Sequence, residues 1–152
     1  DLKWEVEAGT FFGKSASEVQ YIERKFIRGS DLFFFSQPLM TMQLLDSTFN
    51  TTRPYLQAFA IHHFNGAIMN KIPLINKLKL QLVAGTAALF IEQEDYAHIE
   101  FYAGLERIFK IKAQLFKMSA FYVVRSNGEP SVNLNFKFGF DFFNSFTNSW
   151  SY

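Results

Sequence analysis

The stretch that decides the fold is residues 132–142, VNLNFKFGFDF. Hydrophobic residues occupy every even-numbered position in it, and the odd-numbered positions hold Asn, Lys, Gly or Asp. Because successive side chains of a β-strand point to opposite faces, this alternation predicts a strand with one apolar and one polar face. Eleven residues is also the length that a tilted transmembrane strand needs. We therefore predict a membrane-spanning strand with its phenylalanines toward lipid and its polar side chains toward the interior of a β-barrel.

Six further segments have the length and composition of strands. Alternation is clear in residues 2–8 and 97–105, and weaker in residues 116–124. Three more segments are strand-like without a clear polar face: residues 32–45, 55–64 and 80–91. Pro38 lies inside the first of these three, where it predicts a bulge or a late start of the strand. The expected fold is all-β, an antiparallel up-and-down transmembrane β-barrel of which about seven strands are present.

The composition fits a membrane barrel better than a small soluble domain. Aromatic residues make up 18% of the 152 residues, and 20 residues are Phe. A soluble domain of this length has limited interior in which to bury them, whereas a barrel points alternate side chains into lipid. The formal net charge of +1 and the absence of Cys argue against a general basic surface for nucleic acid, a disulfide framework and Cys-based metal sites. No apolar run approaches the ~18 residues of a transmembrane helix.

The predicted connections between strands are of two kinds that alternate along the chain. The first kind is polar or acidic: residues 46–54, 92–96 and 126–130. The second kind is partly apolar and holds nine of the fifteen Lys and Arg residues: residues 23–29, 65–79 and 107–112. Alternate connections of an up-and-down barrel lie on opposite sides of the membrane, so we predict the basic ones at the periplasmic side. In the longest of them Pro73 can begin one short helical turn, although an ordered loop fits the same residues.

Several short motifs carry a resemblance to a known family. They are HHFNG at 62–66, NKIPL at 70–74, KLKL at 77–80, GLERIFK at 104–110 and FGF at 138–140. Together they resemble the C-terminal barrel of a Bacteroidota outer-membrane family of unassigned function. The residues that carry the most specific part of this match, in the predicted turn, are His63, Asn65, Gly66, Asn70, Lys71 and Pro73. The family's aromatic-plus-Gly-Asn pattern departs here to Arg28-Gly29-Ser30.

The resemblance implies that the chain is the C-terminal part of a longer protein, and it implies no enzymatic activity. Longer members of that family carry an N-terminal carboxypeptidase-regulatory-like β-sandwich. The chain starts at Asp1 without a signal peptide, and a single-chain bacterial barrel has an even number of strands. We therefore expect the part of its own chain upstream of Asp1 to supply further strands. Residues 1–143 are assigned to the barrel and residues 144–152 to an uncharged tail that ends in an aromatic residue.

The polar faces of the alternating strands supply the candidate site residues. We expect the following side chains to face the lumen: His98, Glu100, Tyr102, Glu106, Lys117, Asn133, Asn135, Lys137 and Asp141. One interpretation makes them proton or substrate contacts. The other, which we favour, is the wet side of barrel strands, held by cross-strand partners such as Lys117.

No set of residues in the sequence predicts catalysis, a metal site or a cofactor. His62 and His63 are adjacent and point to opposite faces of a strand, so they cannot hold one metal together. Glu100 and Glu106 lie roughly 20 Å apart on a strand, too far for paired acid–base work. A nucleophile turn and a Gly-rich phosphate loop are both absent. We assign six aromatic residues to a girdle at the membrane interface: Trp4, Phe33, Phe34, Phe35, Trp150 and Tyr152.

The function expected from the sequence is non-enzymatic. We expect a bacterial outer-membrane barrel that is an accessory or structural component of an envelope transport or secretion complex. Its partners would be outer-membrane lipid, other envelope proteins and its own upstream chain, with no nucleic acid. The alternative is a soluble β-barrel that binds a lipid or other apolar ligand in its interior. That alternative turns the Phe faces inward and the Asn, Lys and Asp faces outward.

Overall fold

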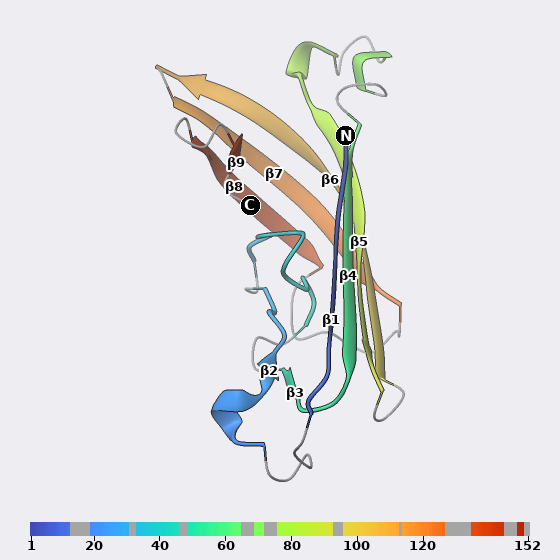
Figure 1. Ribbon diagram of the computed structural model, residues 1–152. Helices are drawn as coiled ribbons and strands as arrows, with labels where there is room; N and C mark the ends of the chain where they lie inside the picture. Colours follow the sequence, from blue (N-terminus) through green and yellow to red (C-terminus); the bar gives the residue numbers. More distant parts are fainter. Residues whose placement is uncertain are drawn as a thin grey trace.

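In the computed structural model a curved antiparallel sheet wraps around an irregular stretch of chain (Figure 1). The structure describes residues 1–12, 19–30, 33–45, 49–64, 69–71, 76–92, 96–112, 114–126, 135–144 and 149–150. The long strands are β1 (Leu2–Gly9), β4 (Tyr55–His63), β5 (Gln81–Ile91), β6 (Tyr96–Ile111), β7 (Gln114–Arg125) and β8 (Phe136–Asn144). The short elements are β2 (Lys25–Phe26), β3 (Asn50–Thr51), β9 (Ser149–Trp150) and the 3-10 helices η1 (Tyr21–Glu23), η2 (Met69–Lys71) and η3 (Asn76–Leu78).

The sheet has the order β1-β4-β5-β6-β7-β8-β9, and every pair of neighbours is antiparallel. The predicted all-β antiparallel architecture is thus confirmed. In the described residues no pairing joins β1 to β8 or β9, so the sheet is open and is not a closed barrel. None of the described helices is long and apolar enough to cross a membrane.

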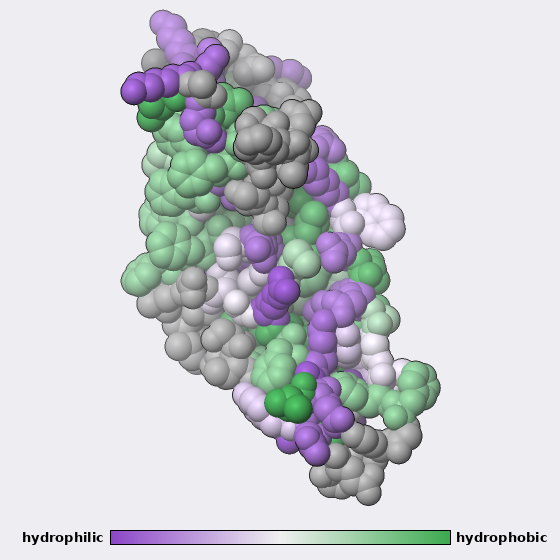
Figure 2. All heavy atoms as spheres, turned by 60° about the vertical axis from the view of Figure 1, so that its left-hand side comes forward, coloured by the Kyte–Doolittle hydropathy of each residue, from purple (hydrophilic) through white to green (hydrophobic). Residues whose placement is uncertain are grey.

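The alternation of the strands produces two faces of opposite character. On β8, Phe136, Phe138, Phe140 and Phe142 are between 52% and 64% exposed, whereas Lys137 between them is fully buried. The register aligns this polarity across the sheet, because inward and outward positions of neighbouring strands lie opposite each other. We call the side that holds Lys137 the concave face and the side that holds the exposed phenylalanines the convex face. Figure 2 shows hydrophobic residues gathered along the upper left edge of the molecule, with hydrophilic residues at the upper tip and across the middle and lower part of the view.

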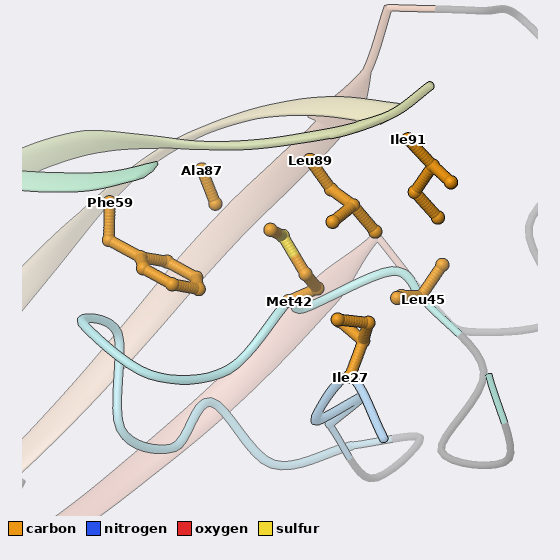
Figure 3. Packing of buried hydrophobic residues seen from close by; sticks show 7 residues of the cluster. All are labelled: Ile27, Met42, Leu45, Phe59, Ala87, Leu89 and Ile91. Atoms are coloured by element: carbon orange, nitrogen blue, oxygen red, sulfur yellow. The ribbon is translucent and has the colours of Figure 1, made fainter. Parts of the chain in front are cut away.

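The core lies between the concave face and a piece of the connection from β1 to β4. This piece, residues 27–30 and 33–45, is called the inner segment below. Figure 3 shows Met42 of the inner segment pointing between Phe59 and Leu89 of the sheet. One hydrophobic cluster consists of Ile27, Met42, Leu45, Phe59, Ala87, Leu89 and Ile91. A second consists of Phe35, Leu44, Ile61, Val83, Tyr102, Phe121 and Val123.

The predicted strand at residues 32–45 is wrong. Gln37 has a positive φ of 43°, and its carbonyl accepts the N–H groups of Met40 and Thr41, which forms a turn around Pro38. Because proline has no N–H to donate to a neighbouring strand, this turn interrupts any ladder. The described residues here form only isolated bridges: residues 41–45 are buried, while Phe33 and Phe35 hydrogen-bond to the backbone of Phe138 in β8.

The predicted connections also need correction. Residues 107–111 belong to β6, which continues to a turn at Lys112, where φ is 55°. Because β1 pairs directly with β4, residues 23–29 form part of one long connection and do not cross to the basic end of the sheet. In Figure 1 η1, β2 and β3 lie at the opposite end from η2, η3 and the β6–β7 turn. The predicted helical turn at Pro73 lies outside the described residues, between η2 and η3.

Glycines on the concave face make room for neighbouring aromatic rings. A Cβ atom at Gly104 would collide with the Phe121 ring and with the carbonyl oxygen of Ala120. A Cβ atom at Gly85 would meet the Tyr102 side chain in the same way. These two rings form part of the second cluster, so the glycines allow it to pack flat against the backbone of the sheet.

We predict that Gly104→Val lowers the free energy of unfolding by about 1–3 kcal/mol, because the new side chain overpacks the Phe121 site. The matched control is Ala103→Val, since Ala103 is the adjacent residue and is exposed on the convex face. The measurement is the urea midpoint of intrinsic tryptophan fluorescence for the folded protein. Equal midpoints for the two variants would contradict this packing.

Candidate functional site

The candidate polar residues lie on the concave face, where the structure buries most of them. The fully or almost fully buried ones are His98, Glu100, Tyr102, Glu106, Lys117 and Lys137. Asn135 and Asp141 are half-buried, and Asn133 lies outside the described residues. Burial of so many ionisable groups requires partners, because a charge without a partner in a low-dielectric interior is strongly unfavourable. The structure groups these partners into two networks.

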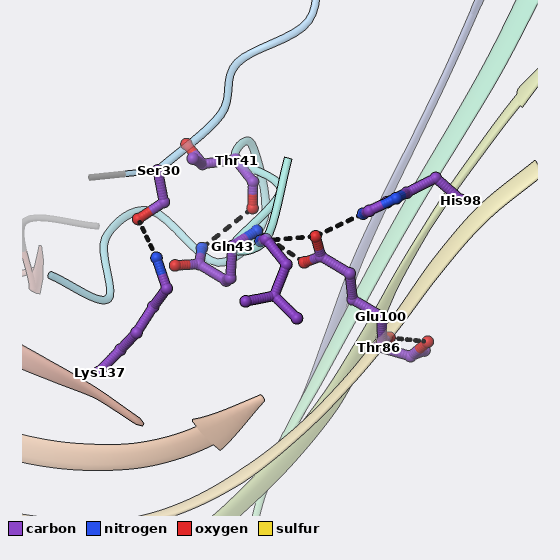
Figure 4. A network of polar contacts seen from close by, with 8 residues as sticks. Ser30, Thr41, Gln43, Thr86, His98, Glu100 and Lys137 are labelled. Atoms are coloured by element: carbon purple, nitrogen blue, oxygen red, sulfur yellow. Dashed lines mark hydrogen bonds and ion pairs between the residues drawn. The ribbon is translucent and has the colours of Figure 1, made fainter. Parts of the chain in front are cut away.

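The first network is built on the carboxylate of Glu100, which is 0% exposed. Its Oε2 atom accepts the backbone N–H of Gln43 at 2.6 Å, and its Oε1 atom accepts the backbone N–H of Leu44 at 2.7 Å. The Nε2 atom of His98 lies 2.6 Å from Oε1 (Figure 4). A carboxylate only accepts hydrogen bonds, so Nε2 of His98 is the donor. Glu100 therefore joins strand β6 to the backbone of the inner segment.

The inner segment adds polar contacts of its own. The buried side chain of Gln43 donates through Nε2 to the carbonyl oxygens of Ser36 at 2.9 Å and Thr41 at 3.0 Å. These two bonds hold the turn around Pro38 closed. The Nζ atom of Lys137 donates to Oγ of Ser30 at 3.4 Å, which connects β8 to the start of the inner segment. Figure 4 shows that these contacts come from the same region as the Glu100 carboxylate.

The second network lies further along β6, toward the end of the sheet that carries η2, η3 and the β6–β7 turn. Lys117 Nζ lies 3.4 Å from Glu106 Oε1 and 3.2 Å from Asp141 Oδ2. His63 Nε2 lies 3.6 Å from Glu106 Oε2. Four strands thus contribute one residue each to this cluster. Lys117 is the cross-strand partner that the sequence predicts, while the participation of His63 and Asp141 follows only from the register.

A third polar group lies at a cavity of 260 Å³ that is lined by residues of β1, β2, β4 and the inner segment. The Glu7 carboxylate there accepts hydrogen bonds from Lys25, from Gln57 and from the Tyr55 hydroxyl at 2.7 Å. Burial acts to lower the pKa of Lys25, but the hydrogen bond and the charge of Glu7 outweigh it and raise that pKa above its usual range. Glu7 and Gln57 are cross-strand partners in the β1–β4 pair, whereas Lys25 reaches them through the fold of the long connection, so no sequence pattern links the four residues.

The turn residues that carry the family motif are only partly described. His63 ends β4 and joins the Glu106 network, and Lys71 is exposed at the end of η2. Asn70 lies in η2, while Asn65, Gly66 and Pro73 lie outside the described residues. Among the described motif residues, His63 therefore belongs to the polar lining.

The described contacts of this lining hold strands and the inner segment together. Within the described residues no group of three or more His, Asp or Glu side chains lies close enough to hold a metal ion. Glu100 is occupied by two backbone donors, and Glu106 lies against Lys117 and His63. The arrangement is that of a polar interior whose charges hold neighbouring strands and the inner segment in place.

The fold and its lining define a class: antiparallel sheet proteins with an apolar outer face and an inner face that combines buried ion pairs with hydrophobic clusters. The chain belongs to a family of unknown function (DUF5686), whose C-terminal domain matches residues 1–105. None of the curated proteins matches the chain, and none of the solved structures does.

We predict that Lys117→Met lowers the free energy of unfolding by about 3–5 kcal/mol, because it leaves the carboxylates of Glu106 and Asp141 without the cation between them. Lys110→Met is the control, since Lys110 is exposed on β6. Adding Glu106→Gln to Lys117→Met restores part of the loss. Chemical denaturation of the four proteins measures these differences, and a Lys117→Met variant as stable as Lys110→Met would contradict the ion-pair network.

Proposed function

We propose that this chain is part of a transmembrane β-barrel of the bacterial outer membrane, with its convex face in lipid. The observation that carries the proposal is the composition of that face. Its exposed large residues are Leu2, Trp4, Val6, Leu56, Phe90, Phe101, Leu105, Met118, Tyr122, Val124, Phe136, Phe138, Phe140 and Phe142. No Asp, Glu, Lys or Arg occurs at the outward positions of the long strands. These are the even-numbered positions of β1, β4, β5 and β8, those of β7 from Phe116 to Val124, and the odd-numbered positions of β6 up to Leu105.

A surface of this kind is unusual for a protein in water. Soluble proteins rarely expose contiguous apolar patches larger than a few hundred Å², and larger patches mark a membrane or protein contact. A barrel in lipid has the reverse requirement, namely apolar side chains outward and polar side chains inward. Because a membrane-spanning sheet must satisfy its backbone groups internally, strands cross membranes in closed barrels.

The open edges of the sheet support the idea that further strands come from the rest of the chain. Asp1 and His63 exchange backbone hydrogen bonds. In an antiparallel pair only every second residue bonds to the partner strand, so the even-numbered residues of β1 do not bond to β4. The N–H and C=O groups of Trp4 and Val6 therefore point away from β4, toward the open edge. The described residues provide no strand at that edge. The family match to a C-terminal domain is consistent with more chain upstream.

The role that we propose in the envelope is non-enzymatic: an accessory or structural component of a transport or secretion complex. The resemblance to a Bacteroidota outer-membrane family supports this location. The soluble alternative, an apolar-ligand carrier, requires the Phe faces inward. The structure has the reverse arrangement, because Phe138 is exposed and Lys137 is buried, and this counts against the soluble alternative.

The test is a pair of substitutions in the full-length protein, inserted into lipid vesicles. Phe140→Arg places a charge on the convex face at the middle of β8, where lipid would raise the cost to about 2–4 kcal/mol. Phe12→Arg is the control, since Phe12 is 88% exposed but lies outside the strands. We expect Phe140→Arg to reduce the folded fraction, measured by resistance to carbonate extraction and by slower gel migration of unboiled samples.

In water an exposed Phe→Arg change shifts stability by only about ±0.5 kcal/mol. If Phe140→Arg behaves like Phe12→Arg, or if the wild-type protein is extracted into plain buffer as a monodisperse species, the membrane assignment is wrong.

A further inference from the structure

The inner segment occupies the space enclosed by the curved sheet. Its apolar side chains reach the wall in two successive zones along the strands. In one zone Met42 and Ile27 pack with Leu89 of β5 (Figure 3). In the other zone the Phe35 ring stacks on Phe121 of β7 with ring centroids 3.8 Å apart. The segment therefore fills the concave side where a barrel of this kind would otherwise have a lumen.

The strongest directed contact between the segment and the wall is the Glu100 carboxylate. Two consecutive backbone N–H groups, those of Gln43 and Leu44, converge on its two oxygens. Both residues are buried, so neither N–H has water as an alternative acceptor. Because leaving a buried donor unsatisfied is more costly than losing an ordinary surface hydrogen bond, this one carboxylate has a large influence on where the segment lies.

The segment is also attached to β8. Phe35 donates its N–H to the carbonyl oxygen of Phe138 at 2.8 Å, and Phe138 donates its own N–H to the carbonyl oxygen of Phe33 at 2.8 Å. Lys137 holds Ser30 from the same strand. The inner segment thus joins β6 in the middle of the sheet to β8 near its edge, across the whole concave side.

We infer that the inner segment is an occluding segment that closes the lumen of the barrel, and that the Glu100 carboxylate is its clamp. The inference rests on the proposed function, because it takes the concave face as the lining of a membrane pore. In its described part the segment contains isolated bridges and no helix or strand of its own. It is therefore held by these contacts and by the two hydrophobic clusters, while the pairing of the long strands does not run through it. Ions and small hydrophilic solutes cross only after it has moved.

The experiment measures ion conductance of the full-length protein in planar lipid bilayers. The wild-type protein is expected to remain closed for most of the recording. Glu100→Gln keeps the size of the side chain but replaces one accepting oxygen with an NH₂ group, so openings become about tenfold more frequent. Glu92→Gln is the control, because it is the same substitution at an exposed residue of a connection.

A reversible tether tests whether the inner segment itself is what moves. Phe34 and Phe138 form a bridge between the segment and β8, and both side chains are 52% exposed. Bridged backbones lie about 5 Å apart, within the range of a disulfide. We add Phe34→Cys and Phe138→Cys to Glu100→Gln, after replacing any cysteine elsewhere in the full-length protein. Oxidation should abolish the extra openings, and reduction should restore them.

A second loosening variant covers the case in which Glu100→Gln does not fold. Gln43→Ala removes the side chain that closes the turn of the inner segment and leaves the wall unchanged. It should raise the frequency of openings in the same direction, and the same tether should suppress them.

The outcomes separate the two proposals. Two results overturn the occluding segment alone, provided that the protein resists carbonate extraction. One is a wild-type protein whose conductance is steadily open. The other is a pair of loosened variants that open no more often than the wild-type protein. Extra openings that persist in the oxidised tether also overturn it. A protein that does not insert into bilayers at all overturns the proposed function, and the occluding segment falls with it.

Discussion

Strand alternation places charged side chains on the concave face, where they are buried and need partners. The position of the inner segment and of the neighbouring strands depends on which partners they have. Glu100 satisfies this constraint with two backbone N–H groups of the inner segment and with His98. Glu106 satisfies it with Lys117, which also holds Asp141 on the next strand. The first solution brings a remote stretch of chain into the interior. The second fixes the relative position of β6, β7 and β8.

Over the part of the strands that the structure describes, the convex face has no comparable ion pairs, and this asymmetry links the fold to the proposed function. Apolar residues gain little by facing outward unless something other than water covers them. On β8 the phenylalanines are turned outward while a lysine takes the interior position between them. Lipid outside and a polar, ion-paired lining inside account for both choices. The glycines at positions 85 and 104 then allow aromatic rings to share the crowded interior with the charged groups.

The long strands could be predicted from the sequence because alternation is a local property. Residues 97–105 and 116–124 fall in β6 and β7, and the described part of residues 132–142 belongs to β8 from Phe136 onward. Residues 32–45 could not be placed in this way. Their aromatic run is typical of a strand, but the Gln37–Pro38 turn and the carboxylate of Glu100, more than fifty residues away, determine their position. Three consecutive phenylalanines without alternation, followed three residues later by a proline, were the local signal against a strand.

The same division applies to the candidate site. The sequence places His98, Glu100 and Glu106 on one face of one strand, which the structure has as well. Their partners on the inner segment and at His63 depend on tertiary contacts and register, which no spacing along the chain reveals. The Glu7 group is the extreme case, since its members come from β1, β2 and β4 and share no motif.

The most direct test of the two-faced sheet is a nitroxide scan along β8 of the full-length protein in lipid bilayers, with one label at a time from residue 136 to residue 142. Oxygen, which concentrates in the acyl chains, should collide with labels at 136, 138, 140 and 142 and be excluded at 137, 139 and 141. A period of two with this phase is the predicted result. Labels at the even positions that collide instead with a water-soluble nickel reagent would contradict the account.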